Sequence, residues 1–174
     1  GYKYMFAVLS TSEYYLAPVL DIIAQRAKAG WKAPSDLRIG MAFENDGFSL
    51  DVRAGVLDVA KKYNMKIVID DKLPADLSDM SATLTKFKAL KPDILLISGH
   101  SKGAATAARQ IEEMKIQAPV IAYTHCEAAK VHEKFPKSAV GVMCPTQWLD
   151  NLPKQDKYFG DAAKWNADFK KVHP

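Results

Sequence analysis

The sequence predicts an α/β fold with an open, doubly wound parallel sheet, and three observations lead to this prediction. Residues 37–69 read as a strand, a helix and a second strand, because two apolar runs flank a stretch with helical periodicity. In one sheet this order gives a parallel pair with a right-handed crossover. Further apolar runs begin near residues 93, 119 and 139, spaced by about one helix and one strand. The run at 94–97 is apolar on both faces, as a central strand between two layers of helices should be.

The unit at residues 37–69 is the clearest part of the pattern. Residues 37–43 are rich in strand formers, and a polar turn follows at once. Helical spacing then places these apolar side chains on one face: Val52, Val56, Val59, Ala60 and Tyr63. We expect Ser49 to cap this helix, and Asp70 and Asp71 to end the second strand as a solvated pair.

Shorter elements are expected before this unit. Residues 4–9 have the composition of a short strand. Residues 15–29 have helical periodicity and are followed by Gly30, a residue typical of helix ends. Pro18 fits only in the first turn of that helix.

After the unit, helices and strands continue to alternate. Ser78 or Asp79 can cap a helix that residues 91–93 stop. The remaining expected elements are a helix at 102–114, a strand at 119–123, a helix at 127–135 and a last strand at 139–143. The tail is expected to be helical from about Tyr158, without a closing strand.

Composition excludes several classes of function. The 174 residues are 48% hydrophobic and 25% charged, which suits one globular domain with a core. The net charge of +4 comes from scattered lysines without a dense basic block, so we expect no nucleic-acid partner. No apolar run approaches the roughly 20 residues of a membrane span. No charged-then-apolar leader is present, so we expect that any secretion signal has been removed or lies outside this chain.

Ligands of open α/β sheets bind outside the carboxyl ends of the strands, where helix N-termini and free backbone N–H groups converge. This rule alone gives a set of candidate segments: Glu44 to Ser49, Asp70 and Asp71, His100 and Ser101, Thr124 to Cys126, and Pro145 to Trp148.

Catalytic and cofactor motifs are missing from these segments. The turn at 44–49 has one glycine instead of a dinucleotide-binding GxGxxG, and GHSKG lacks the Lys-Ser/Thr of a P-loop. No GxSxG elbow is present. A phospho-accepting receiver domain would need an Asp where Ser98 or His100 stands. We therefore expect no enzyme, no catalytic residue and no cofactor.

Four residues near strand ends have side chains that bind soft metals: His100, His125, Cys126 and Cys144. No pair among them has ligand spacing on one element, so we expect no metal site. Neither cysteine belongs to a CxxC pair. Two cysteines permit one disulfide without implying it.

An ordered set of short motifs carries a family resemblance. Its members are Gly47-Phe48, Asp79-Met80-Ser81, Leu84, Lys86-Phe87-Lys88, Pro92-Asp93, Arg109-Gln110 and Ala118-Pro119-Val120. In this order they resemble the second lobe of the type I periplasmic solute-binding proteins of ABC importers, in the branched-chain amino-acid-binding branch. The opening residues 1–6 are similar to the segment that crosses into this lobe, so the resemblance covers nearly the whole chain.

The resemblance implies non-enzymatic capture of a small molecule between two lobes and its delivery to a membrane permease. The parent protein would be a monomer in the periplasm, or extracellular and tethered to the membrane. Ligand contacts in the family fall on an aromatic residue after the first strand and on the turns after the third and fourth strands. Carried onto this sequence, with neighbours in the same turns, they are Asn45, Phe48, Ser49, His100, Ser101, Thr124 and His125.

The ligand class follows from these side chains. Phe48 offers an apolar face, although it could equally pack the first turn of its helix, and the histidines and hydroxyls can donate to a carboxylate. Amino-acid-binding members usually have a carboxylate in the turn after the fourth strand, whereas here Glu127 lies beyond that turn. We expect a small carboxylate-bearing solute, either an amino acid or an aromatic acid. Trp148 is expected to cover loop structure.

The family's proteins have two lobes, and this chain is long enough for one. We expect residues 1–174 to form a single ligand-binding lobe whose partner lobe lies outside the chain. The same fold also serves as the sensory or effector-binding domain of receptors and transcription regulators. That alternative depends on sequence beyond this chain.

Overall fold

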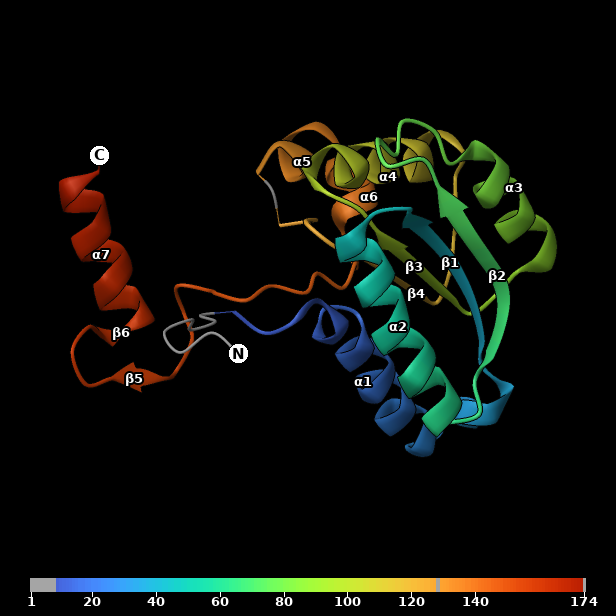
Figure 1. Cartoon of the computed structure of the whole chain (residues 1–174), viewed down its shortest axis with the longest axis horizontal. Coiled ribbons are helices and arrows are strands. Elements are labelled where there is room, and N and C mark those ends of the chain that lie inside the picture. The colour runs from blue at the N-terminus through green and yellow to red at the C-terminus, as the bar shows by residue number, and fades with distance from the viewer. Residues whose placement is uncertain (1–8, 128, 174) are drawn as a thin grey trace.

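Residues 9–127 and 129–173 are described by a computed structural model, in which four parallel strands form the main sheet (Figure 1). These are β1 (Arg38–Glu44), β2 (Lys66–Leu73), β3 (Ile94–Ser98) and β4 (Val120–Tyr123). Their order across the sheet is β2-β1-β3-β4. All strands therefore point their carboxyl ends to the same edge. The predicted strand at residues 4–9 lies almost entirely outside the described residues.

Helices cover both faces of the sheet, as the doubly wound fold requires. The helices α1 (Ala17–Lys28) and α2 (Gly47–Lys62) pack on one face, and α3 (Ser81–Leu90) and α4 (Ser101–Glu113) on the other. Alternate residues of β3 enter the two cores, because successive side chains of a strand point to opposite faces. Ile94 and Leu96 join α1 and α2, while Leu95 and Ile97 join α3 and α4.

The last predicted strand, residues 139–143, is reduced to one bridge between Met143 and Ala122 of β4. The short helices α5 (Ala129–Lys134) and α6 (Pro136–Ala139) precede it, so Ala139 ends a helix. Gly141 then has a positive φ of 81°, which turns the backbone away from an extended course. The prediction of a fifth full strand was wrong for this reason.

The start of α2 corrects the expected cap. The helix begins at Gly47, and its N-cap is Asp46, whose carboxylate accepts a 2.7 Å hydrogen bond from the backbone N–H of Ser49. Ser49 donates this bond from inside the first turn of the helix, so it does not cap the helix. For α3 the N-cap is Met80 and no side chain caps the helix, so the expected cap at Ser78 or Asp79 was wrong; Asp79 instead accepts a 3.0 Å hydrogen bond from the N–H of Ser81.

The strand β2 continues past its predicted end to Leu73. Asp70 and Asp71 therefore lie inside the strand, opposite Met41 and Ala42 of β1. Side chains from α2 and α3 reach across to neutralise them: Arg53 pairs with Asp70, and Lys86 pairs with Asp71 at 2.9 Å. These ion pairs allow two adjacent carboxylates to stand in an edge strand.

The C-terminal segment extends away from the sheet and ends in a helix that lies apart from the other helices (Figure 1). It holds the short hairpin strands β5 (Gln155–Asp156) and β6 (Gly160–Asp161) and the helix α7 (Ala162–Val172). The helix starts later than predicted because Tyr158 belongs to the hairpin and Asp161 provides the cap, accepting from the N–H of Lys164 at 2.8 Å. Phe159, Phe169 and other apolar side chains of this segment are exposed.

Two short 3-10 helices complete the described chain: η1 (Ser12–Tyr14) and η2 (Pro34–Asp36). None of the helices in the described ranges has the length and apolar character that crossing a bilayer requires.

Candidate ligand site at the strand ends

Three turns meet at the carboxyl edge of the sheet. They follow β1, β3 and β4, and they carry Phe48, His100 and His125 respectively. The turns come together because β1, β3 and β4 are neighbours in the sheet and run in the same direction. Residues far apart in the sequence are thus placed side by side.

The three rings form one cluster. The ring centre of Phe48 lies 5.4 Å from that of His100 and 5.7 Å from that of His125, and the two imidazoles stack at 5.8 Å. Tyr15, just before α1, packs edge-on against Phe48 at 5.2 Å. His100 is exposed, whereas Phe48 and His125 are half-buried. The cluster offers an apolar surface edged by imidazole N–H groups, which is suited to a ligand with an apolar body and an acceptor group.

Thr124 is buried and joins two of the turns from within. Its hydroxyl donates to the carbonyl oxygen of Gly99 at 2.6 Å and accepts from the N–H of Gly99 at 3.0 Å. Only 1% of the residue is exposed. Thr124 thus fixes the turn that carries His100, and its direct contact with a ligand remains a prediction.

Ser49 is also buried, with none of its surface exposed. Its hydroxyl accepts a 3.1 Å hydrogen bond from Ser98 at the end of β3. This bond ties the first turn of α2 to β3, and it holds the neighbouring Phe48 in place. Ser49 thus positions the first turn of α2 in this structure, and its contact with a ligand remains a prediction.

Asn45 and Ser101, the remaining predicted contacts, are exposed at the same edge. The backbone N–H of Asn45 donates to the carbonyl of Leu73 at 2.8 Å, which fixes the residue while leaving its side chain at the surface. Ser101 is the first residue of α4. Both side chains remain predicted ligand contacts.

Beside the rings lies a group of three side chains from the candidate segments whose meeting the sequence did not predict. Glu44, Asp46 and His100 each bring a ligating atom within 4.8 Å of the others. The ring Nε2 of His100 is 3.0 Å from Oδ2 of Asp46. Glu44 is the last residue of β1 and is 1% exposed, so it is a charged residue type at the end of an otherwise buried apolar strand. The one signal in the sequence was an acidic residue directly after a buried strand.

The two carboxyl groups differ in their electrostatics. Burial raises the pKa of Glu44, and the nearby Asp46 raises it further. For Asp46, burial also acts to raise the pKa, but the hydrogen bond from the N–H of Ser49 and the contacts with Glu44 and His100 outweigh it and hold the pKa below its usual range. The geometry therefore favours a charged Asp46 next to a Glu44 that is costly to ionise.

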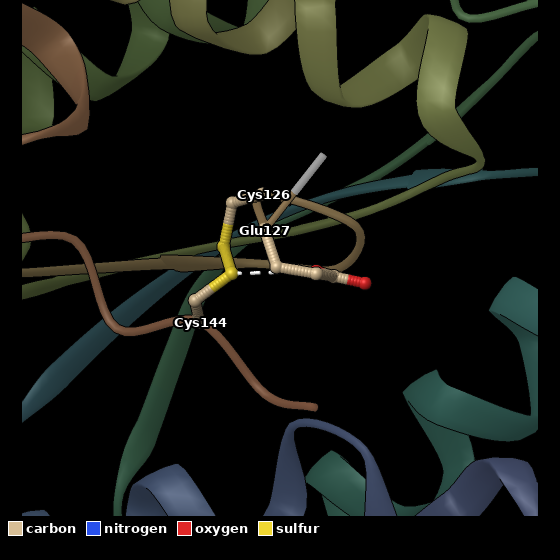
Figure 2. Close-up of side chains that lie close together, drawn as sticks. All are labelled: Cys126, Glu127 and Cys144. Carbon is tan, nitrogen blue, oxygen red and sulfur yellow. Dashed lines mark hydrogen bonds between the residues drawn. A yellow bond between two sulfur atoms is a disulfide. The ribbon is translucent and has the colours of Figure 1, made fainter. Parts of the chain in front are cut away.

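A disulfide joins Cys126 to Cys144, as Figure 2 shows. It links the turn after β4 to the residue that follows the bridge at Met143, and it thus fixes His125, whose φ of 58° is left-handed. The sequence left this pairing open. The bond removes both thiols from the set of potential metal ligands.

Glu127 points back toward this site. One of its carboxylate oxygens lies 3.4 Å from Sγ of Cys144 (Figure 2), and the other lies 3.8 Å from Nδ1 of His125. The sequence placed Glu127 beyond the turn and outside the site. In the structure an exposed carboxylate stands beside the second imidazole.

Trp148 belongs to a different surface. Its ring packs edge-on against Trp165 of α7 at 5.6 Å, and both line a hollow of 610 Å³ on the C-terminal segment together with Phe159. This hollow is lined by residues from 148 to 165, and the carboxyl ends of β1 to β4 contribute none of them. Trp148 thus covers loop and helix structure, as expected, rather than the edge of the sheet.

Comparison with known proteins gives one family and one architecture. The sequence profile described as "periplasmic binding protein" matches residues 1–174. The Leu/Ile/Val-binding protein homolog 8 of Brucella abortus is 22% identical over 114 residues, which are 65% of this chain and 28% of that protein. This chain therefore spans less than a third of that relative's length.

Solved structures share the fold at low sequence identity. The leucine-binding protein LivK of Thermotoga maritima has a TM-score of 0.75 and 14% identity, over 95% of this chain and 44% of that one. A fatty acid ABC transporter substrate-binding protein of Thermomonospora curvata has a TM-score of 0.67 and 13% identity, over 83% and 36%. The parallel sheet and its flanking helices are thus those of a single lobe in this kind of protein.

Proposed function

This chain belongs to the periplasmic binding protein family, and we propose that it is a ligand-binding lobe of an extracytoplasmic solute-binding protein that works with an ABC importer. The family is one of binding proteins rather than enzymes, and a periplasmic location of the parent protein follows from membership. The partners would be a small-molecule ligand and an ABC permease in the membrane.

The observation that carries the proposal is the ring cluster at the strand ends. Phe48, His100 and His125 come from three turns and meet at the edge where α/β folds of this type bind ligands. The family match over residues 1–174 supports a ligand-binding role for this chain.

We propose a small carboxylate-bearing solute as the ligand. The imidazoles of His100 and His125 can donate hydrogen bonds to a carboxylate, and Phe48 can pack against an apolar side chain or ring. Asn45 and Ser101 are exposed nearby and can add polar contacts. Glu127, 3.8 Å from His125, can hold an ammonium group, so both an amino acid and an aromatic acid fit the chemistry of this face.

We further propose that residues 1–174 form one lobe of a two-lobed clamp. The chain spans 28% of the Brucella relative and 44% of the Thermotoga structure. An isolated lobe buries one side of a ligand, so its affinity should be weak, in the millimolar range rather than the micromolar range of a complete pocket.

Weak binding of this kind is measured best by NMR. We would titrate the ¹⁵N-labelled chain, in EDTA to exclude metal effects, with leucine, valine, phenylacetate and benzoate. We expect saturable shifts in the backbone amides of Gly47 to Ser49 and Gly99 to Ser101. The solute with the lowest Kd in this titration defines the ligand class.

Matched variants test the residues. Phe48→Ala and His125→Ala should each weaken binding at least about tenfold, the equivalent of 1.4 kcal/mol. His173→Ala is the control, because His173 is exposed at the end of α7 and stacks only on Phe169 among the described rings. Shifts that survive both Phe48→Ala and His125→Ala, or that map to α7, would refute the proposed site.

A further inference from the structure

Glu44 is a buried acid without enough partners. It is 1% exposed, and its Oε2 has no hydrogen-bond partner among the described residues. A buried polar atom without a partner costs free energy, and a buried charge without one costs far more. A cation bound next to this oxygen would offset this cost.

Two glycines leave the space that this carboxylate occupies. A Cβ atom built on Gly99 would lie 2.7 Å from Oε1 of Glu44, and one built on Gly103 would lie 2.8 Å from the same atom. Any larger residue at either position would push the carboxylate away. Two glycines in the turn after β3 and in α4 therefore give Glu44 its space beside the start of that helix.

Two further donors face the same point. Asp46 and His100 bring ligating atoms within 4.8 Å of a Glu44 oxygen and of each other. Asp46 is held by the N–H of Ser49 through Oδ1 at 2.7 Å, which leaves Oδ2 directed to Nε2 of His100 at 3.0 Å. The three donors come from the end of β1, the cap of α2 and the cap position of α4.

We propose that Glu44, Asp46 and His100 bind a divalent metal ion, with zinc as the best match to this donor set. Carboxylate oxygens and an imidazole nitrogen are ordinary zinc ligands, and three protein ligands with an open fourth position are typical of sites that also bind a small molecule. The His100 side chain is 59% exposed and that of Asp46 22%, so the open position faces solvent. The proposal does not depend on the identity of the organic ligand.

Metal binding also fits the charges of the site. Two carboxylates in contact repel each other, and a divalent cation between them converts that repulsion into attraction. The bond from Ser49 to Asp46 then acts as the outer contact that orients a ligating carboxylate. Without a metal, the alternative is that Glu44 stays protonated and donates a hydrogen bond to the carboxylate of Asp46.

The test is a calorimetric titration of the whole chain, free of tags and first treated with EDTA, with Zn²⁺ in non-reducing buffer. Non-reducing conditions keep Cys126 and Cys144 joined, so that their thiols do not compete for the metal. We expect one ion per chain and a rise in the melting temperature that EDTA reverses.

Glu44→Gln and His100→Ala are the informative variants. Each should weaken Zn²⁺ binding more than about 100-fold, because even outer contacts of metal sites are worth about 10–100-fold. His173→Ala should bind as the native chain does. Melting of the metal-free variants shows whether they are folded, and Glu44→Gln is close in shape to the protonated acid.

Two outcomes would overturn the proposal. The first is Zn²⁺ binding that Glu44→Gln and His100→Ala leave unchanged, which would place the ion on unrelated surface groups. The second is a native chain that Zn²⁺ does not stabilise, together with a Glu44→Gln variant as stable as the native chain. That result would assign the site to a shared proton instead of a metal.

Discussion

The carboxylate of Asp71 is held by two side chains of the helix that follows its strand. The Thr83 hydroxyl donates to it at 2.7 Å and Lys86 at 2.9 Å. Burial raises the pKa of Asp71, but these two hydrogen bonds outweigh burial and hold the pKa below its ordinary value of 3.8. The folded state therefore binds this proton more weakly than the unfolded state does.

Asp71→Asn should lower the free energy of unfolding at pH 7 by about 1 kcal/mol, since it removes a charge-assisted hydrogen bond that is partly screened by solvent. A lowered folded pKa stabilises the protein above the unfolded value near 3.8, and this contribution disappears as the pH falls through the folded value. Urea unfolding at pH 7 and at pH 3 measures the difference. The exposed Asp58→Asn is the control, and an equal loss at both pH values would contradict the assignment.

At the residue scale, the sequence placed the three rings at strand ends but did not show how the small polar groups beside them are buried. Phe48, His100 and His125 converge because each follows a strand of one parallel sheet. The burial of Ser49 and Thr124 depends on how closely the turns pack, which no local pattern encodes. Glu44 was missed as a partner of His100 because β1 is buried on both faces, so its periodicity does not show where a side chain points.

At the scale of elements, η1 packs directly against the backbone of α2. A Cβ atom built on Gly55 of α2 would lie 2.0 Å from the carbonyl oxygen of Glu13 in η1. Only a glycine permits the backbone of the short helix to rest on α2 at this point. The contact orders the chain next to Tyr15, which packs on Phe48.

Gly55→Ala should lower the free energy of unfolding by roughly 1–3 kcal/mol, the usual cost of forcing an extra group into a packed interior. Helix propensity alone predicts the opposite sign, a gain of up to about 1 kcal/mol. Gly47→Ala in the same helix is the control, because nothing lies within 4 Å of its added Cβ. Urea unfolding of both variants decides, and a stabilised Gly55→Ala would show that η1 moves aside freely.

Most elements could be predicted because strands and helices alternate with different hydrophobic periods. The four parallel strands, the two-sided core and the helices α1 to α4 all follow from this alternation, whereas the order β2-β1-β3-β4 across the sheet was not predicted. The errors lie where tertiary contacts decide: β2 runs on through Asp70 and Asp71 because Arg53 and Lys86 pair with them, and Gly141 turns the chain out of a fifth strand. The hairpin before α7 carried no turn signal strong enough to separate it from the helix.

At the scale of the whole molecule, the C-terminal segment and the sheet lobe are separate structures. The helix α7 packs on its own hairpin and on Trp148, and it lies away from the sheet in Figure 1. The core that stabilises the lobe is built from β1 to β4 and their helices, without α7.

Removal of residues 151–174 should therefore change the melting temperature of the lobe by less than about 2 °C, a shift that corresponds to at most about 1 kcal/mol. Circular dichroism at 222 nm follows the lobe in both forms. A fall of 10 °C or more would show that the segment contributes to the core. A matched chain that keeps the segment but carries Trp165→Ala separates loss of packing from loss of length.

The Cys126–Cys144 bond encloses α5 and α6 in a covalent loop. Trypsin that cuts at the exposed Lys134 or Lys137 would sever the peptide backbone inside this loop. The two pieces would still travel together on a gel run without reductant, and they would separate once reductant is added. A nicked preparation could thus pass as intact, because the disulfide would still join the piece that carries β1 to β4 and both strand-end histidines to the piece that carries Cys144 and α7.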